Sequence, residues 1–267
     1  MSYRNDAQKN LERFEVEFQS GDNERLKYAA LELRMAMEAL TYDRAFAYKD
    51  EFPPTEYETW QPRKVMSVLL EIEPTADQNC SVAFGLQETY GVPAPVMQSL
   101  GAERVLSMAI LRKHYDALGS YLHTQSMKKI RDGNLINFDK MRKRCQEIAV
   151  FIRDILSSPI FNVTVGNFSK WDCDECGKTI RKRLPFGQKE VDAECYHCVA
   201  SYKLVDKGNG KIECHPNRHK VKCASDRCKK SLFFWQRDFD IGKTWECTEC
   251  KGLNTFVLGV LHETKAR

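Results

Sequence analysis

The sequence of 267 residues predicts a multidomain α+β protein, in which an N-terminal all-α helical bundle is followed by two small β-rich modules. Three observations lead to this prediction. Apolar residues in the first part of the chain repeat at alternating spacings of four and three, which is the period of an amphipathic helix. Nine of the eleven cysteines follow residue 170. The balance of charge changes at the same place.

Charge and cysteine content together divide the chain near residue 170. From Ser169 to the end, 20 Lys and Arg stand against 14 Asp and Glu, a net charge of +6. The preceding residues contain 21 against 23, a net charge of −2. Because a joint shift in composition marks a domain boundary, we expect the bundle over 1–160 and the two modules over 161–210 and 211–267.

The overall composition is that of an ordinary globular protein. With 42% hydrophobic and 29% charged residues, the composition does not predict wholesale disorder. The first residues contain no apolar run of the signal-peptide type, and no run approaches the ~18 residues that a membrane helix needs. We therefore expect a soluble, cytoplasmic protein that has no membrane partner.

Four stretches of the N-terminal part are predicted to be helices. The first covers 23–45, and Pro62 begins the second at 63–72. A third is expected over 101–123, and Asn137 is a good cap for a fourth. The apolar stripe of the first stretch consists of Leu26, Ala30, Leu33, Met37 and Leu40.

Between the second and third predicted helices the periodicity is lost. Residues 80–86 and 90–96 resemble a short hairpin or a loop insertion. Cys80 and Cys145 are interpreted as small buried hydrophobic residues. The expected N-terminal architecture is a helical bundle with one irregular insert.

Eight cysteines of the C-terminal part repeat one pattern. A short cysteine knuckle is followed, after eighteen residues, by a C-x2-C pair, and the whole arrangement occurs twice. The downstream first knuckle is two residues longer, so matching cysteines lie 50 or 52 positions apart. The eight residues are Cys173, Cys176, Cys195, Cys198, Cys223, Cys228, Cys247 and Cys250. The pattern indicates an internal duplication of a unit of about fifty residues.

Two knuckles on neighbouring hairpins bring four thiolates around one ion. This closed tetrahedral shell is the geometry of structural zinc, and the spacing resembles that of zinc ribbons over residues 168–262. We expect one structural Zn²⁺ in each module, contributing an apparent ~10–16 kcal/mol of folding free energy. Strand-like segments at 161–165, 230–239 and 255–261 flank the cysteine pairs.

Other uses of these cysteines fit the sequence less well. A disulfide scaffold conflicts with the odd number of cysteines and with a reducing compartment. A thioredoxin-like redox pair would precede an amphipathic helix, and none follows here. Iron or iron–sulfur ligation by the same thiolates stays an alternative to zinc. Cys214, His215 and His219 are assigned to the linker between the modules rather than to a third site.

Basic and aromatic residues surround the cysteine pairs. Cations neutralise phosphates and rings stack on unpaired bases, so this mixture is typical of a nucleic-acid surface. We predict RNA, or else DNA, as the partner, with protein contact as the alternative. At least one of Phe233 and Phe234 is expected in the core. The candidate contact residues are Arg181, Lys182, Arg183, Lys222, Arg227, Lys229, Lys230 and Trp235.

Two segments of the N-terminal part resemble the HEPN superfamily of helical-bundle domains. They are ALELRMAMEAL at 30–40 and LRKHYDALGSYLH at 111–123. The late-helix segment typical of the family is matched here by Tyr115, Leu118, Gly119 and His123. The resemblance covers roughly 120 residues and implies a bundle that dimerises. Many members are ribonucleases that act as toxins or in antiviral defence.

The arginine that active HEPN members require is absent from its usual place. It should precede His123 by a short spacing, where Asp116, Ala117 and Leu118 stand instead. Arg112 lies ~16 Å from His123 along a helix that rises ~1.5 Å per residue, too far to share one phosphate. We therefore expect no enzyme. A metal-independent endoribonuclease would use Arg112, His114, His123 and Glu38.

The sequence thus predicts a zinc-binding, non-enzymatic accessory or regulatory protein. Its bundle would form a homodimer or dock a protein partner, and its two modules would bind nucleic acid. A HEPN-type ribonuclease serving as a toxin or defence effector is the first alternative. A protein–protein scaffold within a larger assembly is the second.

Overall fold

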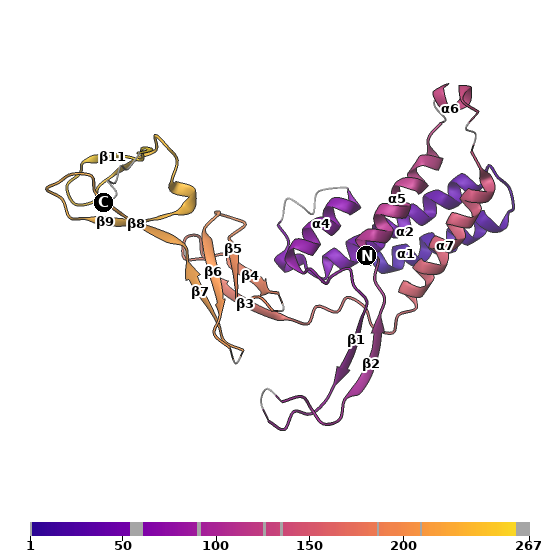
Figure 1. Ribbon diagram of the computed structural model, residues 1–267, viewed down its shortest axis with the longest axis horizontal. Helices are drawn as coiled ribbons and strands as arrows, with labels where there is room; N and C mark the ends of the chain where they lie inside the picture. Colours follow the sequence, from indigo (N-terminus) through magenta and orange to yellow (C-terminus); the bar gives the residue numbers. More distant parts are fainter. Residues whose placement is uncertain are drawn as a thin grey trace, which may run out of the picture. The chain divides into compact units, whose positions relative to one another are not determined.

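The computed structural model divides into two compact units, Met1–Val165 and Gly166–Arg267, which we call the helical unit and the ribbon unit (Figure 1). The first unit ends five residues beyond the predicted end of the bundle. The structure describes residues 2–53, 61–89, 92–124, 127–133, 136–185, 187–208 and 210–259.

The helical unit is built around α2 (Leu26–Phe46), which contacts α1, α4, α5 and α7. Figure 1 shows the long helices lying side by side as a bundle. The other helices are α1 (Tyr3–Gln19), η1 (Lys49–Glu51), α4 (Pro62–Ile72), α5 (Met108–Leu122), α6 (Met127–Arg131) and α7 (Phe138–Leu156). A helical N-terminal part is therefore confirmed. No described helix is long and apolar enough to cross a membrane.

The predicted apolar stripe of α2 forms the centre of the core. All five of its residues are buried, which follows from the helical period that placed them on one face. Asn137 caps α7 as predicted, since its side chain accepts a hydrogen bond from the Lys140 N–H at 2.8 Å. Helix α1 is not among the four predicted helices, although Ala7, Leu11 and Phe14 repeat at helical spacing and are buried.

The third predicted helix begins later than expected. Its first residues form β2 (Gln98–Glu103), which pairs antiparallel with β1 (Cys80–Phe84), and α5 starts only at Met108 behind the N-cap Ser107. Gly101 has φ +124°, a conformation closed to helices and costly for any residue with a Cβ. The predicted insert is therefore a hairpin whose second strand is Gln98–Glu103 rather than residues near 90–96, of which 90 and 91 lie outside the described part.

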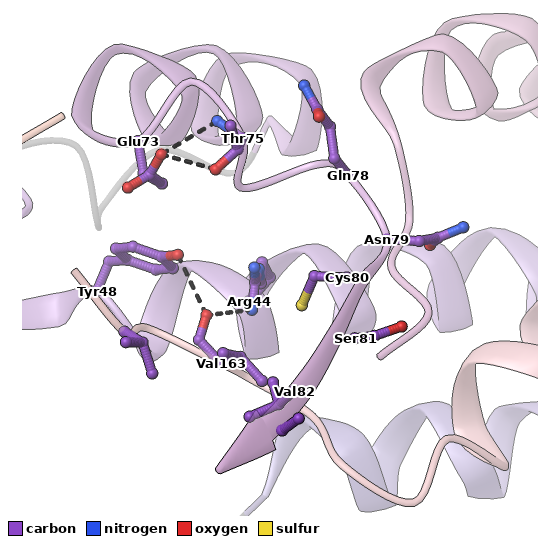
Figure 2. A pocket seen from close by; sticks show the side chains of 12 residues that line it. Arg44, Tyr48, Glu73, Thr75, Gln78, Asn79, Cys80, Ser81, Val82 and Val163 are labelled. Atoms are coloured by element: carbon purple, nitrogen blue, oxygen red, sulfur yellow. Dashed lines mark hydrogen bonds between the residues drawn. The ribbon is translucent and has the colours of Figure 1, made fainter. Parts of the chain in front are cut away.

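A buried ion pair holds the base of this hairpin. Arg44 of α2 lies 3.0 Å from Glu103, and both side chains are almost completely enclosed. Arg44 also donates to the carbonyl oxygen of Val163, as does the Tyr48 hydroxyl (Figure 2). Residues 161–165, expected to be a strand, are instead irregular here. Cys80 lies beside the pair and is partly exposed, whereas Cys145 is buried as predicted.

The ribbon unit consists of small antiparallel sheets. The first ribbon contains β3–β7 and the second contains β8–β11 together with the short helix η2 (Gln236–Asp238). The strands are β3 (Asn167–Asp172), β4 (Thr179–Leu184), β5 (Glu190–Glu194), β6 (Ser201–Asp206), β7 (Ile212–Pro216), β8 (Arg218–Lys222), β9 (Ser231–Trp235), β10 (Thr244–Glu246) and β11 (Leu253–Thr255). The pairs are β3–β4, β8–β9 and β10–β11, and β6 lies between β5 and β7.

Two details differ from the expected division of this unit. The first ribbon's sheet continues to Pro216 through β7, whereas the boundary was expected at 210. Cys214 and His215 therefore lie in a strand, and His219 lies in the next, rather than on a free linker. The last strand ends at Thr255; of the segment expected at 255–261, residues 260 and 261 fall outside the described part.

Candidate metal centres and neighbouring surfaces

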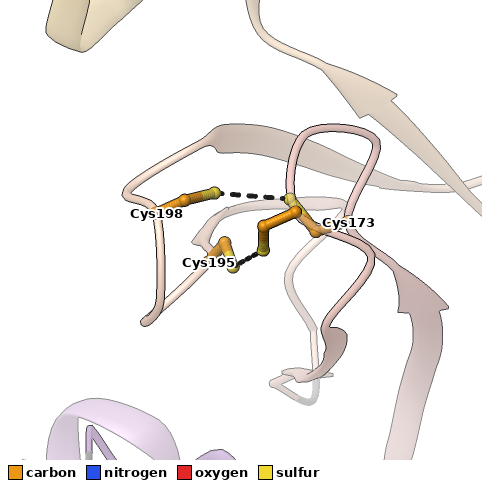
Figure 3. A group of neighbouring side chains, drawn as sticks. Cys173, Cys195 and Cys198 are labelled. Atoms are coloured by element: carbon orange, nitrogen blue, oxygen red, sulfur yellow. Dashed lines mark hydrogen bonds between the residues drawn. The ribbon is translucent and has the colours of Figure 1, made fainter.

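The eight predicted cysteines form two separate clusters of four. Within each cluster the Sγ atoms all lie within 4.8 Å of one another. Figure 3 shows Cys173, Cys195 and Cys198 pointing toward a common centre. The Sγ–Sγ distances are 3.6 Å for Cys173–Cys198 and Cys176–Cys195, and 3.7 Å for Cys223–Cys250 and Cys228–Cys247.

These distances are informative about chemistry. A disulfide would require ~2.0 Å between sulfurs, so the cysteines are not paired covalently. A regular tetrahedron with metal–sulfur bonds of ~2.3 Å has edges of ~3.8 Å, close to the observed separations. Both clusters can therefore hold a metal ion, and they fit tandem zinc-binding modules.

The backbone of each knuckle explains why the cysteines converge. The N–H of the first cysteine donates to a carbonyl five residues later in three knuckles and seven residues later in the longer one. The pairs are Cys173–Lys178, Cys195–Ala200, Cys247–Gly252 and Cys223–Lys230. In the three short knuckles the residue after the second cysteine has a positive φ, and these residues are Gly177, Val199 and Lys251. The left-handed residue turns the chain so that both thiols face inward.

Hydrogen bonds from the protein favour a thiolate in each cluster. Burial raises the pKa of the Cys173 thiol, but bonds from the Tyr202 hydroxyl and two backbone N–H groups outweigh burial and lower the pKa to about 6. The backbone N–H groups of Cys250 and Glu249 lower the pKa of Cys247 to about 7. A thiolate is the form that binds metal, so one sulfur of each cluster is prepared for a cation.

A residue four positions after the last cysteine supports each cluster from outside. In the first ribbon, the Tyr202 hydroxyl lies 3.2 Å from Cys173 Sγ and accepts the Asp174 N–H at 2.9 Å. In the second, Asn254 Oδ1 lies 3.5 Å from Cys223 Sγ and accepts the Ala224 N–H at 2.8 Å. The two positions are 52 residues apart, as are three of the four matching cysteine pairs, but tyrosine and asparagine differ too much for the sequence to indicate a shared role.

Trp235 joins the two ribbons. It was predicted to contact nucleic acid, but only 4% of its surface is exposed. Its ring lies 5.4 Å from that of Tyr202, and the Arg218 guanidinium lies 4.2 Å from its centroid. Its Nε1–H donates to Glu175 at 2.8 Å. Trp235 is therefore an internal anchor and cannot stack on a base.

Arg183 is also unsuited to the role predicted for it. Only 1% of its surface is exposed, and its guanidinium packs so tightly on Gly166 that a Cβ there would lie 2.3 Å from Nη1. Arg181 stacks on the Phe168 ring at 4.1 Å and is half-buried, as is Lys182. The first ribbon therefore offers fewer cations to a ligand than its sequence indicated.

The remaining predicted cations lie around the β8–β9 hairpin. Lys222, Arg227 and Lys229 are exposed, and Lys230 is half-buried. The strand register places Lys220 opposite Phe233, which is 64% exposed. Phe234, on the other face, packs against the rings of Phe239, Trp245 and Phe256. One of the two phenylalanines is thus in a half-buried aromatic cluster rather than in a closed core, and the other is on the surface.

The four residues named for a ribonuclease are not brought together. Arg112 lines a pocket between α2, α4 and α5. His114 is buried toward Arg144 and Glu147 of α7, and burial lowers its pKa. His123 is the exposed C-terminal cap of α5, and Glu38 accepts a hydrogen bond from the Tyr115 hydroxyl. Neither histidine is among the residues that line the pocket of Arg112.

Comparison with protein-family models, curated proteins and solved structures found no match to this chain. The resemblance to HEPN domains therefore rests on the quoted segments alone. The two four-cysteine clusters are consistent with a zinc-binding protein.

Proposed function

We propose that this protein binds two structural zinc ions in tandem ribbons and uses the second ribbon to bind single-stranded nucleic acid, with RNA preferred. The observation that carries the proposal is the exposed ring of Phe233. It lies on a hairpin face with Lys220 directly across from it, and Lys222 is two residues further along the same face.

The geometry of this face supports stacking on an unpaired base. Side chains alternate along β9, so the packing of Phe234 into the aromatic cluster directs Phe233 to the opposite face. The exposed ring leaves an aromatic face open to a ligand. Stacking of one base on an aromatic side chain contributes ~1–3 kcal/mol and tolerates any base.

The charge around the ring supports a phosphate backbone as ligand. Residues 218–235 contain six Lys and Arg against one Asp, which accounts for most of the net charge of the unit. Arg218 is bound to Asp174, but Lys220, Lys222 and Arg227 have exposed side chains. Cations flanking a stacking ring are the arrangement of single-strand binding surfaces.

Zinc is proposed as the ion because the ligand set is four thiolates without an open position. Such a shell suits a structural ion rather than one that activates water. Elemental analysis of the purified protein should find two zinc ions per chain. Iron in place of zinc, recognised by its visible absorbance, would change the cofactor but leave the surface unaffected.

Fluorescence anisotropy with a labelled single-stranded RNA of about 12 nucleotides tests the proposal. We expect Phe233→Ala to weaken binding by ~5–150-fold, corresponding to one lost stacking contact. The matched control is Ile241→Ala, which removes another exposed apolar side chain of the second ribbon. Zinc content equal to that of wild type shows that each variant is folded.

The salt dependence tests the contribution of charge. The double change Lys220→Gln and Lys222→Gln should reduce the slope of log affinity against log salt by ~1.4, since each single-strand phosphate contact contributes ~0.7. The control is Lys203→Gln, the same substitution at a lysine of β6 that is paired with Glu190, and it should leave the slope unchanged. Absence of RNA binding at low salt, or equal losses for Phe233→Ala and Ile241→Ala, would exclude this surface and favour a protein partner.

A further inference from the structure

A second basic site lies in the helical unit. A pocket of about 610 Å³ opens between α2, α4 and α5. Among the residues that the structure describes, four cationic side chains and one carboxylate, that of Asp116, line it. The cations are Arg34, Arg63, Lys64 and Arg112. They come from three different helices, so the fold rather than one helical face gathers them.

Arg34 is held in a fixed orientation. Its guanidinium carbon lies 4.0 Å from the centroid of the Tyr115 ring, and Nη2 donates to the Tyr115 hydroxyl at 2.9 Å. That hydroxyl in turn donates to Glu38, whose carboxylate lies 3.6 Å from Arg34 Nε. Burial and the bond to Glu38 raise the pKa of Tyr115 to about 12, so the phenol stays protonated.

Gly119 makes this orientation possible. It lies one turn after Tyr115 on α5, and a Cβ at this position would lie 2.1 Å from Arg34 Nη1. Any larger residue would push the guanidinium away from α5. Tyr115 and Gly119, two members of the segment that resembles a HEPN helix, therefore have a local explanation as the seat of Arg34.

The described acidic groups near the pocket are already paired. Asp116 is bound to Arg63 at 2.8 Å, and Glu38 is occupied by Tyr115 and Arg34. Among the described residues, no carboxylate lies within 4.0 Å of the Arg112 guanidinium. Cations gathered in a concave site attract a counter-ion of opposite charge, and this attraction rises when the walls exclude water.

We infer that this pocket binds a small phosphorylated ligand carrying at least two negative charges. Arg34 and Arg112 would contact its phosphoryl oxygens, because a guanidinium presents paired donors that match them. The volume is within the range of small-molecule sites. Ser67 and Gln61 offer hydrogen bonds to an uncharged part of the ligand. The inference is independent of nucleic-acid binding by the ribbons.

Isothermal titration calorimetry of the full-length protein with inorganic pyrophosphate tests this inference directly. We expect saturable binding of one pyrophosphate per chain, weaker binding of inorganic phosphate, and at least tenfold weaker pyrophosphate binding by Arg112→Gln. Arg13→Gln, which removes an exposed arginine of α1, is the control and should bind like wild type. No heat at millimolar pyrophosphate and low salt would overturn the inference, as would equal losses in the two variants.

Gly119→Ala provides a variant that moves Arg34 without removing a charge. The clash involves only the tip of a flexible side chain, and Ala favours a helix interior more than Gly, so the fold should be retained. We expect pyrophosphate binding to fall by about the same factor as in Arg112→Gln, with unchanged thermal stability. Normal binding by Gly119→Ala would exclude the seated Arg34 as a ligand contact. Phe233→Ala should bind pyrophosphate normally, which separates this site from the RNA surface.

Discussion

The two ribbons repeat one cysteine pattern but differ in what surrounds it. The first has a small closed core in which Ile180, Tyr202 and Leu204 are buried. The second has an aromatic cluster that is only half-buried, and Phe233 stands outside it. The comparison indicates that the metal knuckles set the shape of each ribbon. Because the strands need not hold the ribbon together alone, their side chains can form either a closed core, as in the first ribbon, or an exposed surface, as in the second.

The residues that support the two cysteine clusters, Tyr202 and Asn254, also differ, and again the first ribbon is the more enclosed one. Tyr202 has a hydroxyl that donates to Cys173, which stabilises a thiolate, and its ring is also part of the core. Asn254 holds the knuckle backbone through Ala224, but its carbonyl oxygen cannot donate to Cys223. The first cluster is therefore supported by both the core and a hydrogen bond, and the second would depend more on a bound ion.

Removal of both metal ions should have the largest effect. A strong chelator is expected to unfold the ribbon unit, since each site contributes an apparent ~10–16 kcal/mol, and the helical unit should stay folded on its own apolar core. Three of the four tryptophans lie in the ribbon unit, so tryptophan emission reports its unfolding while far-UV circular dichroism reports the helices. With limiting chelator the second ribbon should lose structure first. If the tryptophan emission and the circular dichroism both stayed native after complete metal removal, the ions would not be what keeps the ribbons folded.

Replacement of Trp235 should have the next largest effect. Trp235→Ala removes a buried ring and its bond to Glu175, at a cost of ~3–5 kcal/mol in the unfolding free energy of the ribbon unit. Trp245→Ala, which truncates a half-buried ring of the second ribbon, should cost less. Chemical denaturation of the zinc-loaded protein, followed by tryptophan emission, measures both. Equal costs would mean that the ribbons do not depend on this anchor.

Tyr202→Phe should weaken the first metal site specifically. The change keeps the ring and removes the hydroxyl that donates to Cys173, and losses of this type reduce metal affinity by ~10–100-fold. Competition with a chromogenic chelator should show one weakened and one unchanged site. Asn254→Ala is the matched change in the second ribbon, and it should act through the turn at Ala224 rather than through the sulfur. An unchanged affinity in Tyr202→Phe would show that the hydroxyl is not a support.

Val199→Gly should have the smallest effect and the opposite sign. A β-branched residue at φ +59° is strained, whereas glycine adopts this conformation without a Cβ penalty. We expect a gain of about 0.5–1 kcal/mol in the stability of the first ribbon after the entropy cost of glycine. Thermal melting of the zinc-loaded protein measures it. Gly177→Val, the reverse change in the adjacent knuckle, should destabilise the same ribbon.

The sequence predicted those features that depend on spacing alone. The eight cysteines converge as two fours because knuckle geometry is local, and the stripe of α2 is buried because its period is regular. It did not predict that residues near Gly101 form a strand, since that pairing with β1 is decided by a distant segment.

Exposure was the least predictable property of the candidate site. Trp235 and Arg183 are residue types common on nucleic-acid surfaces, but both are buried. Trp235 bonds to Glu175, and Arg183 packs on Gly166, in each case a residue of another segment of the chain. Phe233 and Phe234 could not be distinguished until the strand register was known. The seat of Arg34 on Tyr115 and Gly119 likewise joins two helices that are separated by about eighty residues.

The joint at Trp235 has a consequence for how the ribbons work together. Asp174 and Glu175, the two residues enclosed by the first knuckle, bind Arg218, Trp235 and Arg237 of the second ribbon. An ion bound by Cys173 and Cys176 would therefore also fix the orientation of the β8–β9 hairpin, because it would keep those two carboxylates in place. Removal of the ion from the first site would leave the second ribbon folded but able to rotate relative to the first.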